Sequence, residues 1–295
     1  MNRRALIWGG VGGGVLILFG VVSLCLPGKE DPPPPPREAG RTRVLRTHKI
    51  ATGSELVNKI SGVAPVIEGE NMHNMVARLP RDLARDEVDI LYDILRHGDG
   101  DIYSNPVKND IMNKLRNQDD PPADLTDLLL ELYRDKTHDR VVRLYALQHL
   151  RPWYRIQNHK DPRIREAFFE ALCESDTEIV GVALLALRYL AKDQDGFEKD
   201  EIVKAALEIA QDPAENQLTR ISAIQVAADL QEGGGDATVY REFAEEGNPL
   251  MMRMSAIAAL GQSGDRTHAE FLANVAASEG PLQKPAQVAL KKLLQ

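Results

Sequence analysis

Aromatic residues and cysteine are scarce in this chain. Aromatic side chains make up 5% of its 295 residues, and the two cysteines are Cys25 and Cys173. Two thiols so far apart, one of them inside an apolar run, do not form a disulfide framework and do not indicate a compartment. Val, Ile, Thr and aromatic residues nowhere alternate with polar residues over a sustained stretch, which argues against strands. Leu and Ala are frequent instead and lose little on entering a helix, so the composition favours an all-α fold.

The sequence also lacks the motifs that mark catalysis or a bound metal. It has no phosphate-cradling loop, no GxSxG turn, no HExxH pair, no CxxC and no CxxCH. An acidic turn from Asp99 to Asp110 has the length of a calcium loop, but Tyr103 and Ser104 stand where that loop needs a ligand and a glycine. None of the seven histidines forms an i, i+4 pair with another His or Cys. We therefore predict no metal, no cofactor and no catalytic residues, and expect that the chain is not an enzyme.

Positive charge is not in surplus over the whole chain. The formal net charge is −8 at pH 7. An acidic surface repels the phosphate backbone of DNA or RNA. We expect no nucleic-acid partner.

One long apolar run lies at the N-terminus. Arg3 and Arg4 precede 22 uncharged, mostly apolar residues, 5–26, and a spanning helix needs about 20. The length favours a transmembrane signal anchor, and a cleaved signal peptide is the alternative. The leading arginines favour a single-pass protein with the bulk of the chain periplasmic or otherwise extracytoplasmic, although further basic residues follow the run.

Glycines crowd the apolar run. Gly9 and Gly13, like Gly10 and Gly14, have the GxxxG spacing that lets two membrane helices approach closely. A weakly apolar anchor with small residues is the simpler interpretation. The alternative is a homodimer formed through the Gly-rich anchor.

The order of segments predicts a tethered domain. Residues 1–4 form a short flank, 5–26 the anchor, 27–70 a Pro-rich tether and loosely structured lead-in, and 71–295 the folded part. The five prolines 32–36 favour an extended polyproline II rod that holds the folded part away from the bilayer.

Helical hairpins repeat along the folded part. Apolar blocks come in pairs, and the second block of each pair carries the pattern Arg-x-x-Ala-(Leu/Ile)-x-x-(Leu/Ala). Copies start at Arg143, Ala183, Arg220 and Arg253, with weaker copies at Lys108 and Gln283, at spacings of 35, 40, 37, 33 and 30 residues. The first blocks are Asp82–Arg96, Leu125–Asp135, Arg163–Glu174, Lys199–Gln211, Ala237–Glu246 and His268–Ser278. This predicts an α-solenoid of about six helical hairpins, because one hairpin alone cannot bury both of its faces.

This pattern resembles the HEAT-repeat family, and more narrowly the short bacterial HEAT-like repeats related to those of phycobilin lyases. The copies that start at Arg143, Arg220 and Arg253 match the pattern most closely. The resemblance covers about residues 80–295. The resemblance implies stacked helical hairpins that serve as scaffolds, adaptors and, rarely, enzymes. We expect the repeated arginines to be structural and to pair with neighbouring acidic residues along the stack.

A basic band precedes an acidic C-terminal half. Residues 134–165 hold nine Lys or Arg against three Asp, whereas residues 166–295 have a net charge of −11. Inside the band, Pro152 is expected to end a helix, which would place its aromatic and basic neighbours in a loop. Trp, Tyr and Arg often dominate binding hot spots. The candidate partner-binding residues are Arg151, Trp153, Tyr154, Arg155 and His159. The alternative is that Trp153 fills a gap between helix pairs.

These features favour a membrane-tethered interaction scaffold or adaptor with a protein partner outside the cytoplasmic membrane. One alternative is an envelope-organising element that dimerises through its anchor. Another is the regulatory subunit of an enzyme.

Overall fold

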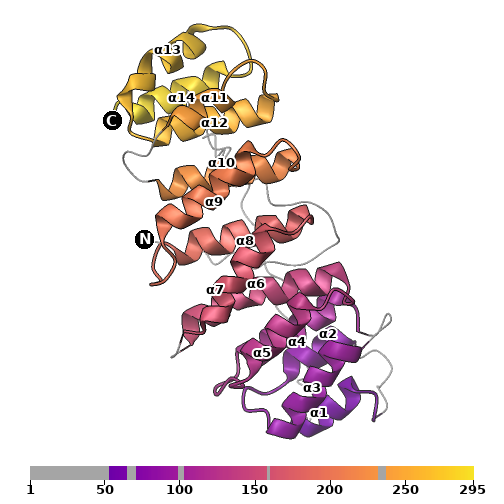
Figure 1. The fold of residues 1–295 in the computed structure, drawn as a ribbon. Coiled ribbons are helices and arrows are strands. Elements are labelled where there is room, and N and C mark those ends of the chain that lie inside the picture. The colour runs from indigo at the N-terminus through magenta and orange to yellow at the C-terminus, as the bar shows by residue number, and fades with distance from the viewer. Residues whose placement is uncertain (1–52, 65–70, 99–102, 158–159, 232–236) are drawn as a thin grey trace, which may run out of the picture. The chain divides into compact units, whose positions relative to one another are not determined.

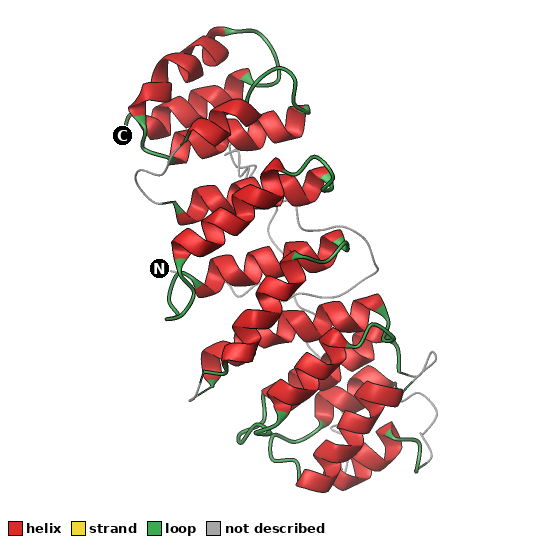
Figure 2. Cartoon of the chain, in the orientation of Figure 1, coloured by secondary structure: helices red, strands yellow, loops and turns green. Residues whose placement is uncertain are grey.

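The computed structural model describes residues 53–64, 71–98, 103–157, 160–231 and 237–295. Within these ranges every regular element is helical: fourteen α-helices and one short 3-10 turn (Figures 1 and 2). All of them belong to one compact unit, Ile50–Gln295. The prediction of an all-α fold built as a helical stack is confirmed.

The helices alternate between two layers. The first helices of the pairs are α1 (Gly53–Ile60), α3 (Arg85–His97), α5 (Leu125–Arg134), α7 (Pro162–Leu172), α9 (Lys199–Gln211), α11 (Thr238–Phe243) and α13 (Ala269–Ala277). The second helices are α2 (Met72–Arg78), α4 (Asn105–Arg116), α6 (Arg140–Ile156), α8 (Thr177–Leu190), α10 (Gln217–Leu230), α12 (Leu250–Gln262) and α14 (Gln283–Leu293).

The second helices form the tighter layer. Each packs on the next along the whole series, from α2 on α4 to α12 on α14. The first helices cover one side of this layer, and only α1, α3, α5 and α7 form substantial contacts with one another in succession. The shared core therefore runs between the layers, through buried residues such as Leu115, Leu147, Leu187 and Leu260.

The stack has seven pairs within the described residues, one more than expected. Residues 53–60 lie inside the predicted lead-in 27–70, yet they form α1, which buries Leu56, Val57 and Ile60 against α2 and α3. An eight-residue helix is marginal in isolation. Its two turns give too short a period to detect, and contact with the neighbouring helices stabilises it.

The N-caps correct the register of one repeat. Arg143 and Arg220 each stand four positions after the N-cap of their helix, Asp139 and Asn216. In α8 the N-cap is Asp176, so the equivalent residue is Val180. The predicted copy at Ala183 is one helical turn too late, because alanine occurs at both 183 and 186 and both are buried.

The repeated arginines cap the preceding helix. Arg143 Nε donates to the Tyr133 carbonyl at 2.9 Å, and Arg220 Nε donates to the Ala210 carbonyl at 2.8 Å. Arg253 repeats the contact at the end of α11. These carbonyls lie at helix C-termini, where no partner exists within the helix. The structural role is confirmed, but the recurring partner is a backbone carbonyl and not the expected acidic residue. Arg143 also pairs with a carboxylate, that of Glu174.

None of the helices in the described ranges is long and apolar enough to cross a bilayer. The predicted anchor 5–26 and the proline run 32–36 lie outside the described residues.

Candidate functional site

The aromatic residues of the predicted patch lie in the core. Helix α6 continues through Pro152 to Ile156, so the expectation that this proline ends the helix is wrong. Trp153 is 6% exposed and its Nε1 donates to Thr126 Oγ1 at 2.8 Å. Tyr154 is 5% exposed and packs edge to face on Phe197, with ring centroids 5.1 Å apart.

The hydrogen bond of Trp153 lies within its own helix pair, on α5, whereas Tyr154 contacts Phe197 between α8 and α9. Both side chains are buried and not available to a partner, which corrects their assignment as contact residues. Packing on both sides of α6 outweighs the helix hydrogen bond that a proline removes.

The remaining candidates lie at the surface or outside the described residues. Arg155 forms an ion pair with Asp193. The Arg151 guanidinium lies over the Tyr189 ring, 4.9 Å from its centroid. His159 lies outside the described residues. A partner contact by Arg151, Arg155 or His159 stays a prediction.

The basic band is neutralised along the stack. Its cations pair with carboxylates that come mostly from the next helix pair, as in Arg134–Glu170, Lys136–Glu174, Arg140–Glu178, Arg143–Glu174, Arg155–Asp193, Arg163–Asp127 and Arg165–Glu201. Lys160 donates to two backbone carbonyls. Within the described part of the band, Arg151 is the arginine that has no carboxylate partner.

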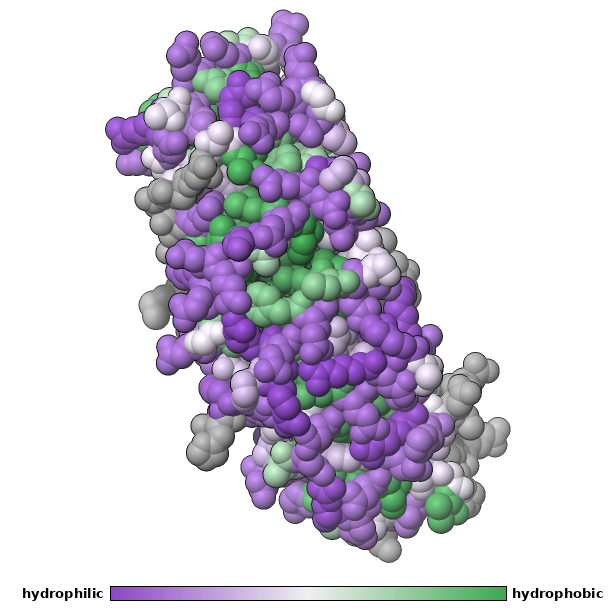
Figure 3. Space-filling model, in the orientation of Figure 1, coloured by the Kyte–Doolittle hydropathy of each residue, from purple (hydrophilic) through white to green (hydrophobic). Residues whose placement is uncertain are grey.

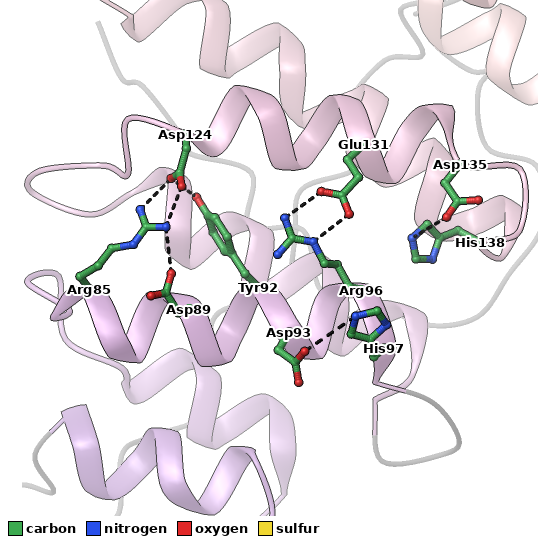
Figure 4. Close-up of polar contacts among 10 residues, drawn as sticks. All are labelled: Arg85, Asp89, Tyr92, Asp93, Arg96, His97, Asp124, Glu131, Asp135 and His138. Atoms are coloured by element: carbon green, nitrogen blue, oxygen red, sulfur yellow. Dashed lines mark hydrogen bonds and ion pairs between the residues drawn. The ribbon is translucent and has the colours of Figure 1, made fainter.

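The same pairing joins α3 to α5 (Figure 4). Arg85 donates to both oxygens of Asp124 at 2.9 and 2.7 Å, and Arg96 to both oxygens of Glu131 at 2.8 and 2.7 Å. These hydrogen bonds lower the pKa of Asp124 and of Glu131. Tyr92 lies between the two pairs, and its burial raises its pKa. The first-helix layer thus uses arginine to join successive repeats.

The exposed side of the second helices differs. On α6 the partly exposed residues Tyr145, Gln148 and Arg151 recur at spacings of three, so they share one face of the helix. We call the face formed by Tyr145, Gln148 and Arg151 of α6, Arg116 of α4, and Arg188 and Tyr189 of α8 the open face. Three arginines of this face, Arg116, Arg151 and Arg188, come from three successive helices.

A buried histidine orients Arg116. His149 is 5% exposed, its Nε2 lies 3.0 Å from Asn109 Oδ1, and its Nδ1 lies 2.9 Å from Arg116 Nη1. Because guanidinium only donates, Nδ1 accepts and Nε2 carries the proton. Burial, with the charge of Arg116, lowers the pKa of His149 to about 3, so the ring is neutral.

Arg116 has no carboxylate among the described residues. Its second contact is with Asn113 Oδ1 at 3.0 Å. Burial lowers the pKa of its guanidinium, and the charge of Arg151 lowers it further. The two arginines thus place uncompensated positive charge side by side on the open face.

Two further cations, Arg188 of α8 and Lys192 just after this helix, share one carboxylate. Arg188 Nε and Lys192 Nζ both lie 2.6 Å from Asp229 Oδ2 of α10. The hydrogen bond from Arg188 lowers the pKa of Asp229 to about 2. Tyr189 is 43% exposed and lies beside both Arg151 and Arg188. The open face around α4, α6 and α8 is therefore cationic, with a half-exposed aromatic ring among its arginines.

A second surface lies on the first-helix side. Figure 3 shows this side as mostly hydrophilic, with an apolar area in its middle over the region of α7 to α10. Phe169 of α7 is half-buried, and Arg165 lies over its ring at 4.6 Å while pairing with Glu201 of α9. In the part of the chain that the structure describes, no group of three or more His, Cys, Asp or Glu could hold a metal ion.

The fold places the chain in the class of all-helical stacks built from paired α-helices, an α-solenoid. No family model matches the chain, and no curated protein matches it either. A structure of human deoxyhypusine hydroxylase in complex with glycerol is similar at 17% identity and a TM-score of 0.33, covering 82% of this chain and 86% of that chain.

This match corrects one expectation. Missing catalytic motifs led us to expect that the chain is not an enzyme, and that inference is wrong, because the matched all-helical chain is a hydroxylase. An α-solenoid sequence without the usual motifs does not exclude catalysis. At this TM-score the likeness carries no argument about the activity of the present chain.

Proposed function

We propose that this chain is a membrane-tethered, HEAT-like α-solenoid that binds a protein partner on its open face, outside the cytoplasmic membrane. One observation carries the proposal: Arg116 and Arg151 lie together on this face without a carboxylate partner among the described residues. The band arginines of the first-helix layer all have such a partner. A charge left unpaired in an otherwise paired surface is available to a ligand.

Tyr189 supports a protein ligand. It is half-exposed between Arg151 and Arg188. Tyrosine and arginine are enriched in the residues that dominate binding between proteins. The rigid helices beneath them fix their spacing, which lowers the entropy lost on binding.

The tether rests on the sequence alone. The apolar residues 5–26 are long enough to span a bilayer, and the prolines 32–36 would hold the solenoid away from it. Attachment to the membrane raises the effective concentration of the open face for partners in the same membrane.

Site-specific cross-linking tests partner binding. A photoreactive residue at Gln148, exposed on the open face, should give adducts with another protein in membranes from cells expressing the full chain. The same residue at Glu166, exposed on α7, is the matched control and should give none. Equal adducts at both positions, or none at Gln148, would rule out the open face as the contact surface.

Fractionation tests the tether. The full chain should stay with the membrane after alkaline extraction, and a variant lacking residues 5–26 should be released. A full chain that is itself released would contradict the anchor, and release of a shortened mature chain would indicate a cleaved signal peptide.

A further inference from the structure

The three open-face arginines occupy one register position. Counted from the N-caps Ser104, Asp139 and Asp176, the twelfth following residue is Arg116, Arg151 and Arg188 in turn. The same position is Ala228 in α10 and Gly261 in α12. The repeat therefore places one arginine per second helix over three successive helices and then stops. We call these three residues the arginine ladder.

The arginine ladder carries more positive charge than the nearby carboxylates neutralise. Arg116 contacts His149 and Asn113, both neutral, and Arg151 contacts the Tyr189 ring. Arg188 has Asp229, which Lys192 also uses. Four cations thus share one carboxylate, in a chain whose net charge is −8.

The spacing of the ladder suits an extended polypeptide. Packed helices lie about 8–10 Å apart, and an extended chain in the polyproline II conformation rises about 3.1 Å per residue with about three residues per turn. Every third side chain of such a segment therefore lies on the same side and would reach the next arginine. A carboxylate at each such position can accept two parallel hydrogen bonds from one guanidinium.

The charge around the ladder limits the length of an anionic ligand. Beyond α8 the position is no longer basic, and residues 191–295 hold 17 Asp or Glu against 10 Lys or Arg, a net charge of −7. A long polyanion such as a nucleic acid would be repelled there. A short acidic peptide can end before it reaches this region.

We propose that the open face binds an extended acidic segment of a partner protein, with acidic residues three apart seated on Arg116, Arg151 and Arg188. Tyr189 packs against the aliphatic part of the segment between two of these contacts. This inference rests on the proposed function and adds the chemistry of the partner.

Peptide binding by the full chain in detergent tests the ladder. The probe is a fluorescein-labelled synthetic peptide with glutamate at every third position in a Gly/Ser background, and its control has glutamine at those positions. Fluorescence anisotropy should show binding of the glutamate peptide that weakens as salt is added. No preference over the glutamine peptide, or tighter binding of an oligothymidylate of similar length, would overturn the proposal.

Substitutions locate the contacts. Arg151→Gln and Arg188→Gln should each weaken binding about tenfold, the loss expected for one charge-assisted hydrogen-bonded pair. Arg134→Gln, which removes a first-helix-layer arginine paired with Glu170, is the control and should change it less than about twofold. The contact of Arg151 is with the Tyr189 ring, so Arg151→Gln should have the same melting temperature as the parent chain.

The two proposals can fail separately. If cross-linking from Gln148 still gives partner adducts in the Arg151→Gln, Arg188→Gln double variant at the parent yield, the ladder is wrong and protein binding stands. If the parent chain gives no adducts, the proposed function itself fails. Loss of adducts in the double variant, with an unchanged melting curve, supports both.

Discussion

His149 makes the stability of the chain depend on pH. The folded protein keeps this ring neutral down to pH about 3, whereas an unperturbed histidine takes up its proton near 6.5. Between these values the unfolded state binds the extra proton, so stability is full above pH 6.5 and falls as pH falls. We expect a loss of roughly 1.4 kcal/mol per pH unit inside that window.

Denaturant unfolding of the full chain at several pH values measures this loss. His149→Gln should have a flatter profile between pH 6 and 4 than the parent chain, because glutamine has no proton to gain. His97→Gln, which changes an exposed histidine on α3, is the control and should keep the parent profile. A His149→Gln profile parallel to that of the parent would show that the ring is not buried as described.

Gly261 allows α12 and α14 to touch. A Cβ placed on it would lie 2.6 Å from the Ala289 Cα and 2.9 Å from the Ala289 carbonyl oxygen, both backbone atoms. Gly261→Ala should destabilise the chain by about 1–3 kcal/mol, the range for overpacking. Gly181→Ala in α8 is the control, because a Cβ there meets nothing within 4 Å. Gly181→Ala should stabilise the chain by up to about 1 kcal/mol. Equal changes in stability from the two substitutions would contradict the close approach of α12 and α14.

At the scale of the element, the repeated arginine joins one helix to the next. Arg143 is buried and links the end of α5 to Glu174 beyond α7, at 2.9 and 2.7 Å. Arg143→Met should cost about 2 kcal/mol, because it leaves the Tyr133 carbonyl and part of the Glu174 charge unsatisfied.

Arg134→Met is the matched control for this element. Arg134 pairs with Glu170, but both side chains are well exposed. Exposed pairs contribute about 1 kcal/mol or less, so thermal denaturation should show the smaller loss here. A larger loss from Arg134 than from Arg143 would mean that surface pairing, and not helix capping, holds the repeats together.

At the scale of the whole molecule, each pair should depend only on its neighbours. A chain ending at Gly264 lacks α13 and α14 and should keep the helicity of the remaining pairs by circular dichroism. In that shorter chain Gly261→Ala should no longer destabilise, because Ala289 is absent. Loss of all helicity on truncation, or an unchanged penalty for Gly261→Ala, would show coupling over longer range.

The sequence by itself predicted the helical architecture. Blocks such as Lys199–Gln211 and Leu125–Asp135 match α9 and α5 within a residue, because helical periodicity and N-cap chemistry are local properties of the chain. The repeat in the second helices was also visible. It was displaced by one turn in α8, where two alanines fit the same pattern.

The tertiary structure decided which residues are free to act. Trp153 and Tyr154 are residue types that are common in binding patches, yet both are buried. Trp153 contacts Thr126, 27 residues earlier, and Tyr154 contacts Phe197, 43 residues later. The basic band is paired with carboxylates from the next repeat, such as Glu170, which lies 36 residues from Arg134.

Contacts between repeats therefore separate structural charge from available charge. Arg116, Arg151 and Arg188 are scattered in the sequence and align only when three helices are stacked in register from their N-caps. Periodicity depends on residues within one helix, and the sequence is sufficient to show it. Charge compensation depends on which side chains meet across two helices, and only the stacked structure determines that.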